Sequence, residues 1–200
     1  MALDLLTRRL RDELEGRAKP LFVGIDGRSG AGKSTLASAI ADDFGRAIVA
    51  VIEGDAFYSG GSGESWDRRS AEEKSAHVID WRRQADVLAD LRANGRAQWL
   101  PFDWEASDWD SEPAPLSAEA MFVESRPIVI LEGAYSCRPE LQPLLDLTVL
   151  LDPASEVRRA QLLARQGDAY RSAWEHRWSE AEEHYFSIIM PRDRFDLVLP

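Results

Sequence analysis

Short apolar runs recur along the chain, and segments with helical spacing of their apolar residues separate them. Five such runs lie at residues 21–25, 47–52, 127–131, 147–151 and 195–199. Runs of this length are typical of strands that are buried on both faces, as in a parallel sheet. The pattern therefore predicts an α/β fold in which helices cover both faces of a five-stranded parallel sheet.

The segments between these runs are predicted helices. Near the N-terminus, four leucines recur at helical spacing, namely Leu3, Leu6, Leu10 and Leu14. They predict an amphipathic helix over residues 2–15 that packs beside the core. Further helices are expected at residues 34–43, 71–76, 80–94, 155–166 and 172–189. Asp80 suits the N-cap of the helix at 80–94, and Gly95 suits its C-terminal stop. Residues 98–104 are either a strand or an extended loop.

A glycine-rich segment follows the first apolar run. Residues 27–34 read Gly-Arg-Ser-Gly-Ala-Gly-Lys-Ser, which is the complete phosphate-binding loop pattern. In such a loop the backbone N–H groups converge on phosphate oxygens, and the next helix adds its positive N-terminus. The residues predicted to bind the nucleotide are Gly27, Ser29, Gly30, Ala31, Gly32, Lys33, Ser34 and Thr35. A plain surface turn is the alternative, but it does not explain why a lysine and a serine stand at this spacing.

The chemistry of this loop predicts roles for two of its side chains. Lys33 would reach the β- and γ-phosphates of ATP, and the Ser34 hydroxyl would bind Mg²⁺. In a parallel sheet, ligands bind beyond the carboxyl ends of the strands. Asp55 follows the second apolar run and Glu132 ends the third, so both are expected on the rim that carries the loop.

Each of these carboxylates has two interpretations. It can orient an acceptor hydroxyl and take its proton, or it can hold Mg²⁺ through water. Alternatively, Asp55 or Glu132 merely caps the helix that follows. Ser34, Asp55 and Glu132 are the predicted metal ligands.

Composition narrows the class of protein. A chain of 200 residues is predicted to be one domain, and its net charge of −11 argues against nucleic acid as a partner. The single cysteine suits a reducing cytoplasm and excludes an internal disulfide. No apolar run approaches the length of a membrane span, so no membrane contact is expected. A homo-oligomer is possible on the sequence alone.

Three segments together resemble a family. Residues 27–35, 54–58 (Gly-Asp-Ala-Phe-Tyr) and 131–133 (Leu-Glu-Gly) are similar to the uridine kinase branch of the P-loop kinases. This branch is related to phosphoribulokinase and pantothenate kinase. The resemblance implies a P-loop NTPase three-layer α/β/α fold with a helical lid. It also implies an acceptor-binding region at about 56–115 and a lid at about 154–172, while the leucine spacing places an N-terminal helix within residues 1–16 of the same single domain.

The resemblance also implies roles for individual residues. Asp55 matches the general base, Asp80 an acid that contacts sugar hydroxyls, and Phe102 an aromatic residue against the base of the acceptor. Tyr58 and Asp103 belong to the same acceptor-binding segments. Two lid arginines, Arg158 and Arg165, are seven residues apart on one helical face and could meet the phosphate oxygens. A solvated helix face is the alternative for both of them.

The chain departs from this branch in three places. Ser59, Gly60 and Gly61 stand where a basic residue usually follows the tyrosine, the usual histidine after residues 101–103 is missing, and the lid lacks paired arginines.

The phosphate loop and the resemblance together predict an ATP- and Mg²⁺-dependent kinase, with a nucleoside such as uridine or cytidine as the leading acceptor. A sugar or a pantothenate-like alcohol is an alternative acceptor. A regulatory ATPase without a small acceptor is the alternative from another class of protein.

Overall fold

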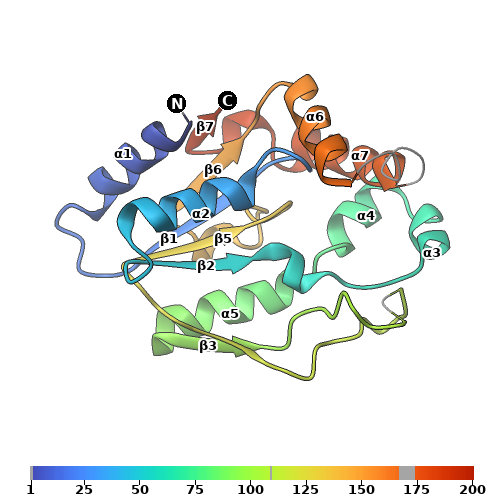
Figure 1. Cartoon of the computed structure of the whole chain (residues 1–200), viewed down its shortest axis with the longest axis horizontal. Helices are drawn as coiled ribbons and strands as arrows, with labels where there is room; N and C mark the ends of the chain where they lie inside the picture. The colour runs from blue at the N-terminus through green and yellow to red at the C-terminus, as the bar shows by residue number, and fades with distance from the viewer. Residues whose placement is uncertain (1, 109, 167–173) are drawn as a thin grey trace.

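The computed structural model describes residues 2–108, 110–166 and 174–200, and the side chains at 165, 166 and 174–176 lie outside that description. Its centre is a parallel sheet with the strand order β2-β5-β1-β6-β7 (Figure 1). The strands are β1 (Leu21–Asp26), β2 (Val49–Glu53), β5 (Ile128–Glu132), β6 (Leu147–Leu151) and β7 (Leu197–Leu199). The prediction of a five-stranded parallel sheet is confirmed.

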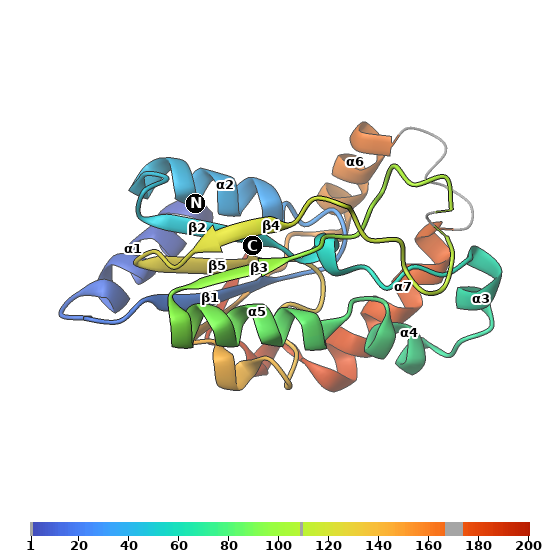
Figure 2. The same cartoon turned by 90° about the horizontal axis from the view of Figure 1, so that it is seen from below.

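Helices cover both faces of this sheet. On one face, Leu6 and Leu10 of α1 (Ala2–Leu14) and Ile40 of α2 (Lys33–Phe44) share a hydrophobic core with Val23 of β1. On the other, Leu88 of α5 (Trp81–Asn94) shares a second core with Phe22. Because successive side chains of a strand point to opposite faces, Phe22 and Val23 serve different cores. Figures 1 and 2 show α2 and α5 on opposite sides of the sheet, which completes the three-layer architecture.

The remaining helices gather beyond the carboxyl ends of the strands (Figure 1). They are η1 (Gly54–Phe57), α3 (Gly63–Asp67), α4 (Ala71–His77), α6 (Ser155–Gln166), α7 (Trp174–His184) and the π-helical turn η4 (Tyr185–Ile189). The helix α7 packs against α4, and Arg177 of α7 donates to both carboxylate oxygens of Asp67 at 2.6 and 2.9 Å. Two short 3₁₀ helices, η2 (Gln142–Leu144) and η5 (Arg192–Arg194), lie in the connections before β6 and β7. A wall of helices therefore surrounds the rim at this end of the sheet.

Local signals explain where α5 begins and ends. The carboxylate of Asp80 accepts hydrogen bonds from the backbone N–H groups of Arg82 and Arg83, at 3.2 and 3.5 Å. Gly95 follows the helix with a φ of +70°, a conformation that favours glycine. Both predicted boundaries are confirmed.

The structure adds a hairpin that the apolar pattern did not predict as a pair. β3 (Arg96–Trp99) runs antiparallel to β4 (Met121–Glu124), with Trp99 opposite Met121 (Figure 2). Three of the four residues of β4 are exposed, so this strand lacks the apolar run that marks the strands of the main sheet. The interpretation of residues 98–104 as one strand or loop was too simple, because the strand lies at 96–99 and needs a distant partner.

The helix predicted for residues 172–189 is only partly α-helical. Residues 172 and 173 lie outside the described part, α7 starts at Trp174, and the turn after His184 is π-helical. Residues 167–172 of the predicted lid likewise lie outside the description. In the described ranges, no helix combines the length and apolar composition that a membrane crossing requires.

Candidate active site

The turn between β1 and α2 has the geometry of an anion-binding loop. The chain leaves the sheet after Asp26 and enters α2 at Lys33, with Gly32 at the N-cap in a left-handed conformation (φ +92°). Because Gly32 has no side chain to cap the helix, the first N–H groups of α2 can bind an anion. The ammonium of Lys33 spans the loop and donates to the carbonyls of Gly27 and Arg28, at 2.9 and 3.2 Å.

A hollow of about 960 Å³ opens in front of this loop. Seven of the predicted nucleotide-binding residues line it, namely Ser29, Gly30, Ala31, Gly32, Lys33, Ser34 and Thr35. Its volume falls in the range of small-molecule sites. The eighth residue, Gly27, lies outside the lining, where a Cβ would meet the carbonyl oxygen of Leu151 at 2.4 Å. It therefore allows the loop to pass close to β6.

Asp55 and Glu132 line the same hollow from neighbouring strands. Asp55 lies in the first turn of η1 and is exposed, whereas Glu132 ends β5 and is only 4% exposed. Burial raises the pKa of Glu132 to about 7, although the positive charge of Lys33 and a hydrogen bond with Ser34 oppose the shift. The negative charge of Asp55 raises this pKa further. The two carboxylates thus act on each other across the rim.

The donor set at this rim suits Mg²⁺. The hydroxyl of Ser34 and the carboxylates of Asp55 and Glu132 are oxygen ligands, which this ion prefers. Within the described ranges, no group of three or more His, Cys, Asp or Glu residues is arranged to hold a metal ion. The residues therefore fit an ion that is held partly by phosphate oxygens and water, as is usual for Mg²⁺.

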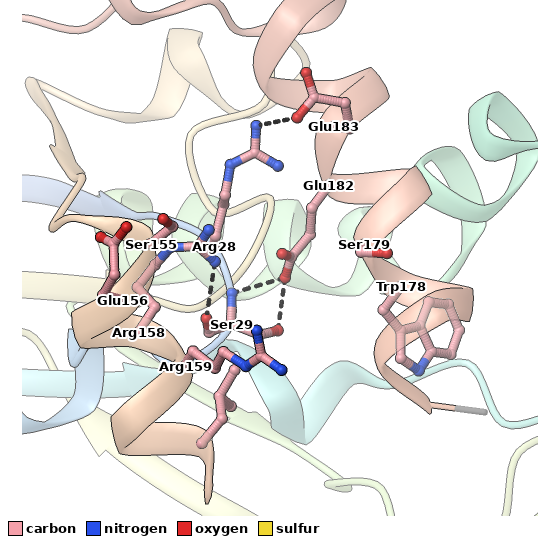
Figure 3. A pocket seen from close by; sticks show the side chains of 11 residues that line it. Arg28, Ser29, Ser155, Glu156, Arg158, Arg159, Trp178, Ser179, Glu182 and Glu183 are labelled. Atoms are coloured by element: carbon pink, nitrogen blue, oxygen red, sulfur yellow. Dashed lines mark hydrogen bonds and ion pairs between the residues drawn. The ribbon is translucent and has the colours of Figure 1, made fainter. Parts of the chain in front are cut away.

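The helix α6 lies directly on the phosphate loop. A Cβ at Gly30, whose φ is +76°, would meet the side chain of Leu162 at 2.6 Å and the carbonyl oxygen of Arg158 at 2.7 Å. The guanidinium of Arg158 donates to the carbonyl of Ser29 at 3.4 Å (Figure 3). Arg158 therefore lies at the loop, and its role toward the phosphates stays a prediction. Arg165 belongs to α6, but its side chain lies outside the described part.

The helix α7 also holds the phosphate loop through hydrogen bonds. The carboxylate of Glu182 accepts hydrogen bonds from the backbone N–H and the hydroxyl of Ser29, at 2.7 and 2.6 Å (Figure 3). Beside it, Arg28 donates to Glu183 at 2.8 Å. Ser29 is thus held by α6 through its carbonyl and by α7 through its N–H and hydroxyl groups.

A narrow cavity of about 110 Å³ adjoins the nucleotide hollow. Ser29, Asp55 and Ala134 line both spaces. Its other described lining residues are largely aromatic or aliphatic, and they are Tyr58, Val78, Ile79, Trp104, Tyr135 and Trp178, with Glu182 as a second carboxylate. An engineered cavity of about 150 Å³ takes one benzene, so this space suits one ring or one small polar group. It is the candidate acceptor pocket.

The structure brings only part of the predicted acceptor set to this pocket. Tyr58 and Asp55 line it, whereas Asp80 caps α5 and lines a separate hollow with Arg69 and His77. Phe102 is buried behind the pocket, edge-on to Tyr58 with ring centres 4.9 Å apart. The carboxylate of Asp103 accepts from the N–H of Glu105. The roles of Asp80, Phe102 and Asp103 toward an acceptor stay predictions.

Sequence reasoning missed several residues of the site. Glu182, Tyr135 and Trp178 line the pocket but belong to no local motif. Asp26 is fully buried at the end of β1, where it accepts from the N–H groups of Gly27, Tyr135 and Cys137 and from the hydroxyl of Tyr185. An acid that ends an apolar run directly before the loop was an available signal for Asp26.

Comparison with known proteins agrees with this geometry. The model of the phosphoribulokinase / uridine kinase family matches residues 22–172. A uridine kinase from Clostridium botulinum (strain Langeland) is 28% identical over 189 residues, which cover 91% of this chain and 88% of that protein.

Solved structures show the same fold. One, described as a possible uridine kinase from Bacillus stearothermophilus, superposes with a TM-score of 0.69 at 20% identity, over 98% of this chain and 99% of that chain. Phosphoribulokinase from Rhodobacter spheroides gives a TM-score of 0.57 at 14% identity, over 89% and 68%. The chain therefore belongs to the phosphoribulokinase / uridine kinase family, and it is a phosphotransferase that acts on the hydroxyl group of a small acceptor.

Proposed function

We propose that the protein transfers the γ-phosphoryl group of ATP to a hydroxyl group of a nucleoside, with uridine and cytidine as the leading acceptors. One observation carries the proposal, which is that Asp55 lines both the nucleotide hollow and the adjoining aromatic pocket. A carboxylate at that junction can meet a hydroxyl that enters from one side and a phosphoryl group held on the other. The relatives named uridine kinase, which align with 91% of this chain, support a nucleoside as acceptor.

The position of each residue in the site suggests its role in this reaction. The N–H groups of the loop and the ammonium of Lys33 hold the phosphates, and Arg158 stands at the same loop to neutralise charge on the transferred group. Asp55 accepts the proton of the acceptor hydroxyl as its oxygen attacks. Mg²⁺, bound by the oxygens of Ser34, Asp55 and Glu132, would supply further neutralisation of the phosphate charge. The helices α6 and α7 would shield the reacting groups from bulk water, which favours transfer to the acceptor over hydrolysis.

A panel of acceptors tests the proposal. The protein is incubated with ATP and Mg²⁺ together with uridine, cytidine, adenosine, D-ribose, D-glycerate or pantothenate, and ADP release and the mass of the product are measured. Uridine or cytidine should give the highest kcat/KM and a product heavier by one phosphoryl group. If only another alcohol is turned over, that alcohol and not a nucleoside is the acceptor. ATP hydrolysis that no acceptor accelerates would favour a regulatory ATPase.

Lys33→Ala provides the matching negative control. Loss of the ammonium removes a charge contact with the phosphates, so turnover should disappear together with the stabilisation that ATP gives against heat. Unchanged ATP affinity in this variant would contradict the assignment of the phosphate loop.

A further inference from the structure

Glu182 is anchored so that only half of its carboxylate is used. Its Oε1 atom accepts both hydrogen bonds from Ser29, at 2.7 and 2.6 Å. Within the described part of the chain, its Oε2 atom accepts no hydrogen bond, although the side chain is only 5% exposed. This oxygen is not among the fully buried unpaired polar atoms of the described part, so it keeps access to the space around the side chain and can receive a donor there. The anchor fixes the carboxylate, and the second oxygen is left for a partner.

Glu182 lines a hollow of about 560 Å³ with Arg28, Arg158 and Arg159, and it also lines the acceptor pocket, which is where an acceptor hydroxyl would lie. Glu182 lines it together with Asp55, and burial together with the negative charges of Glu182 and Asp26 raises the pKa of Tyr135, another lining residue. The charge of Glu182 therefore acts on the interior of the pocket. Figure 3 shows its carboxylate turned toward Ser29, at the junction of the loop and α7.

The described charged groups that line this pocket are all negative, although arginines outside the lining, among them Arg28 and Arg177, oppose the rise in pKa of Tyr135 and Tyr58. Asp55 and Glu182 are its two ionisable carboxylates, and the lining residues that the structure describes include no lysine or arginine. The aromatic walls formed by Tyr58, Trp104 and Trp178 add negative ring faces. Such surroundings attract hydrogen-bond donors and cations, and they repel carboxylates and phosphates.

We propose that Glu182 binds the acceptor directly through Oε2 and makes the pocket selective for acceptors that carry donors and no negative charge. The class includes neutral nucleosides and polyols, and cationic amino alcohols. Hydroxy acids and sugar phosphates are disfavoured because their charge would face two carboxylates. The inference rests on the proposed kinase reaction and identifies the substrate class of the same site.

A conservative substitution separates binding from architecture. In Glu182→Gln, the amide oxygen can still accept from Ser29, but the negative charge is lost and an NH2 group, which cannot accept, takes the place of Oε2. A hydrogen bond to a charged group contributes about 1.5 kcal/mol or more, so the KM for uridine should rise roughly ten-fold or more. The KM for ATP should stay within about three-fold, and the melting temperature should stay close to that of the wild type.

Glu183→Gln is the matched control. Glu183 is the next residue of α7, and its side chain is 68% exposed and pairs with Arg28 outside the acceptor pocket. This variant should leave the KM for uridine unchanged. If Glu182→Gln raises the KM for ATP as much as the KM for uridine, or changes neither, then Glu182 only supports the loop and the proposal is overturned.

The wild-type protein provides a test that does not depend on any variant. Uridine and D-ribose represent neutral acceptors, 2-aminoethanol a cationic one, and D-glycerate and pantothenate anionic ones. Higher kcat/KM for a neutral or cationic compound than for both anions supports the inference, even when that compound is not a nucleoside and the proposed acceptor is wrong. Preferential turnover of either anion would overturn the inference while leaving the kinase activity in place.

Discussion

Two carboxylates on one rim, Asp55 and Glu132, differ in their surroundings and therefore in their chemistry. Asp55 is exposed at the junction of the nucleotide hollow and the acceptor pocket. Glu132 is buried beside Lys33 and Ser34, with a pKa of about 7. A base must reach the acceptor hydroxyl, and of these two carboxylates it is Asp55 that lines the acceptor pocket. A ligand for a cation needs a fixed oxygen, for which Glu132 is better placed.

Asp55→Asn should separate these roles. The substitution keeps the shape of the side chain and removes its ability to take a proton, so turnover should fall by roughly 100-fold or more. ATP binding, measured by the shift in melting temperature, should largely persist. Turnover within a few-fold of the wild type would exclude Asp55 as the base and pass that role to Glu132.

Glu132 should make stability depend on pH in the absence of Mg²⁺ and nucleotide. Between about pH 4.5 and 7 the unfolded chain loses the proton of this carboxyl while the folded protein keeps it. The free energy of unfolding should therefore fall as pH rises through this window, by at most about 3 kcal/mol, and level off above it. In Glu132→Gln this contribution is absent.

The measurement is the melting temperature of both proteins between pH 5 and 8. The variant should gain stability relative to the wild type as pH rises, while its kinase activity is lost. A difference that stays constant over this range would show that burial does not shift the pKa of Glu132.

At the scale of elements, the decisive contact is that of α6 with the phosphate loop. Gly30 has a positive φ and no room for a Cβ, because Leu162 and the backbone of Arg158 lie against it. Gly95 at the end of α5 has a similar φ of +70°, but nothing lies within 4 Å of its Cβ position. Comparing the same substitution at the two glycines therefore separates the cost of the left-handed backbone from the cost of a clash with α6.

Alanine substitutions at these two positions test the contact. Each should cost about 1–2 kcal/mol for the left-handed conformation. Gly30→Ala should cost about 1–3 kcal/mol more, because α6 must move, and it should also weaken ATP binding. Urea unfolding and ATP titration measure both effects. Equal losses of stability in the two variants would mean that α6 does not rest on the loop.

At the scale of the whole molecule, one buried carboxylate connects distant parts of the chain. Asp26 accepts from the N–H of Gly27, from the N–H groups of Tyr135 and Cys137 after β5, and from the hydroxyl of Tyr185 after α7. It therefore links the start of the phosphate loop to the element that carries Glu182.

Asp26→Ala should destabilise the fold strongly. The substitution leaves buried donors without an acceptor, which should cost about 3–5 kcal/mol of the free energy of unfolding. Asp196→Ala is the control, since Asp196 also accepts two hydrogen bonds, from the N–H and the hydroxyl of Thr148, but is exposed. Its loss should be clearly smaller in urea unfolding. Similar losses would assign no special role to Asp26.

Features that depend on neighbouring residues followed from the sequence. The apolar runs predicted all five strands of the sheet, and the spacing of residues 27–34 predicted the loop, because the signal for each of them lies in consecutive residues. Parallel connections then placed Asp55 and Glu132 on the same rim as the loop.

The acceptor pocket was decided by tertiary structure. Ser29 and Glu182 are 153 positions apart, and no periodicity relates them. Asp80 shows the same limit, since its place in the sequence suits both a helix cap and an acceptor ligand, and the structure shows it capping α5. The walls of the pocket come from η1, the segment after β3, the turn after β5 and α7, and they meet only because these elements pack around the rim. Local sequence therefore determined the phosphate loop, and the docking of α7 determined the candidate acceptor pocket.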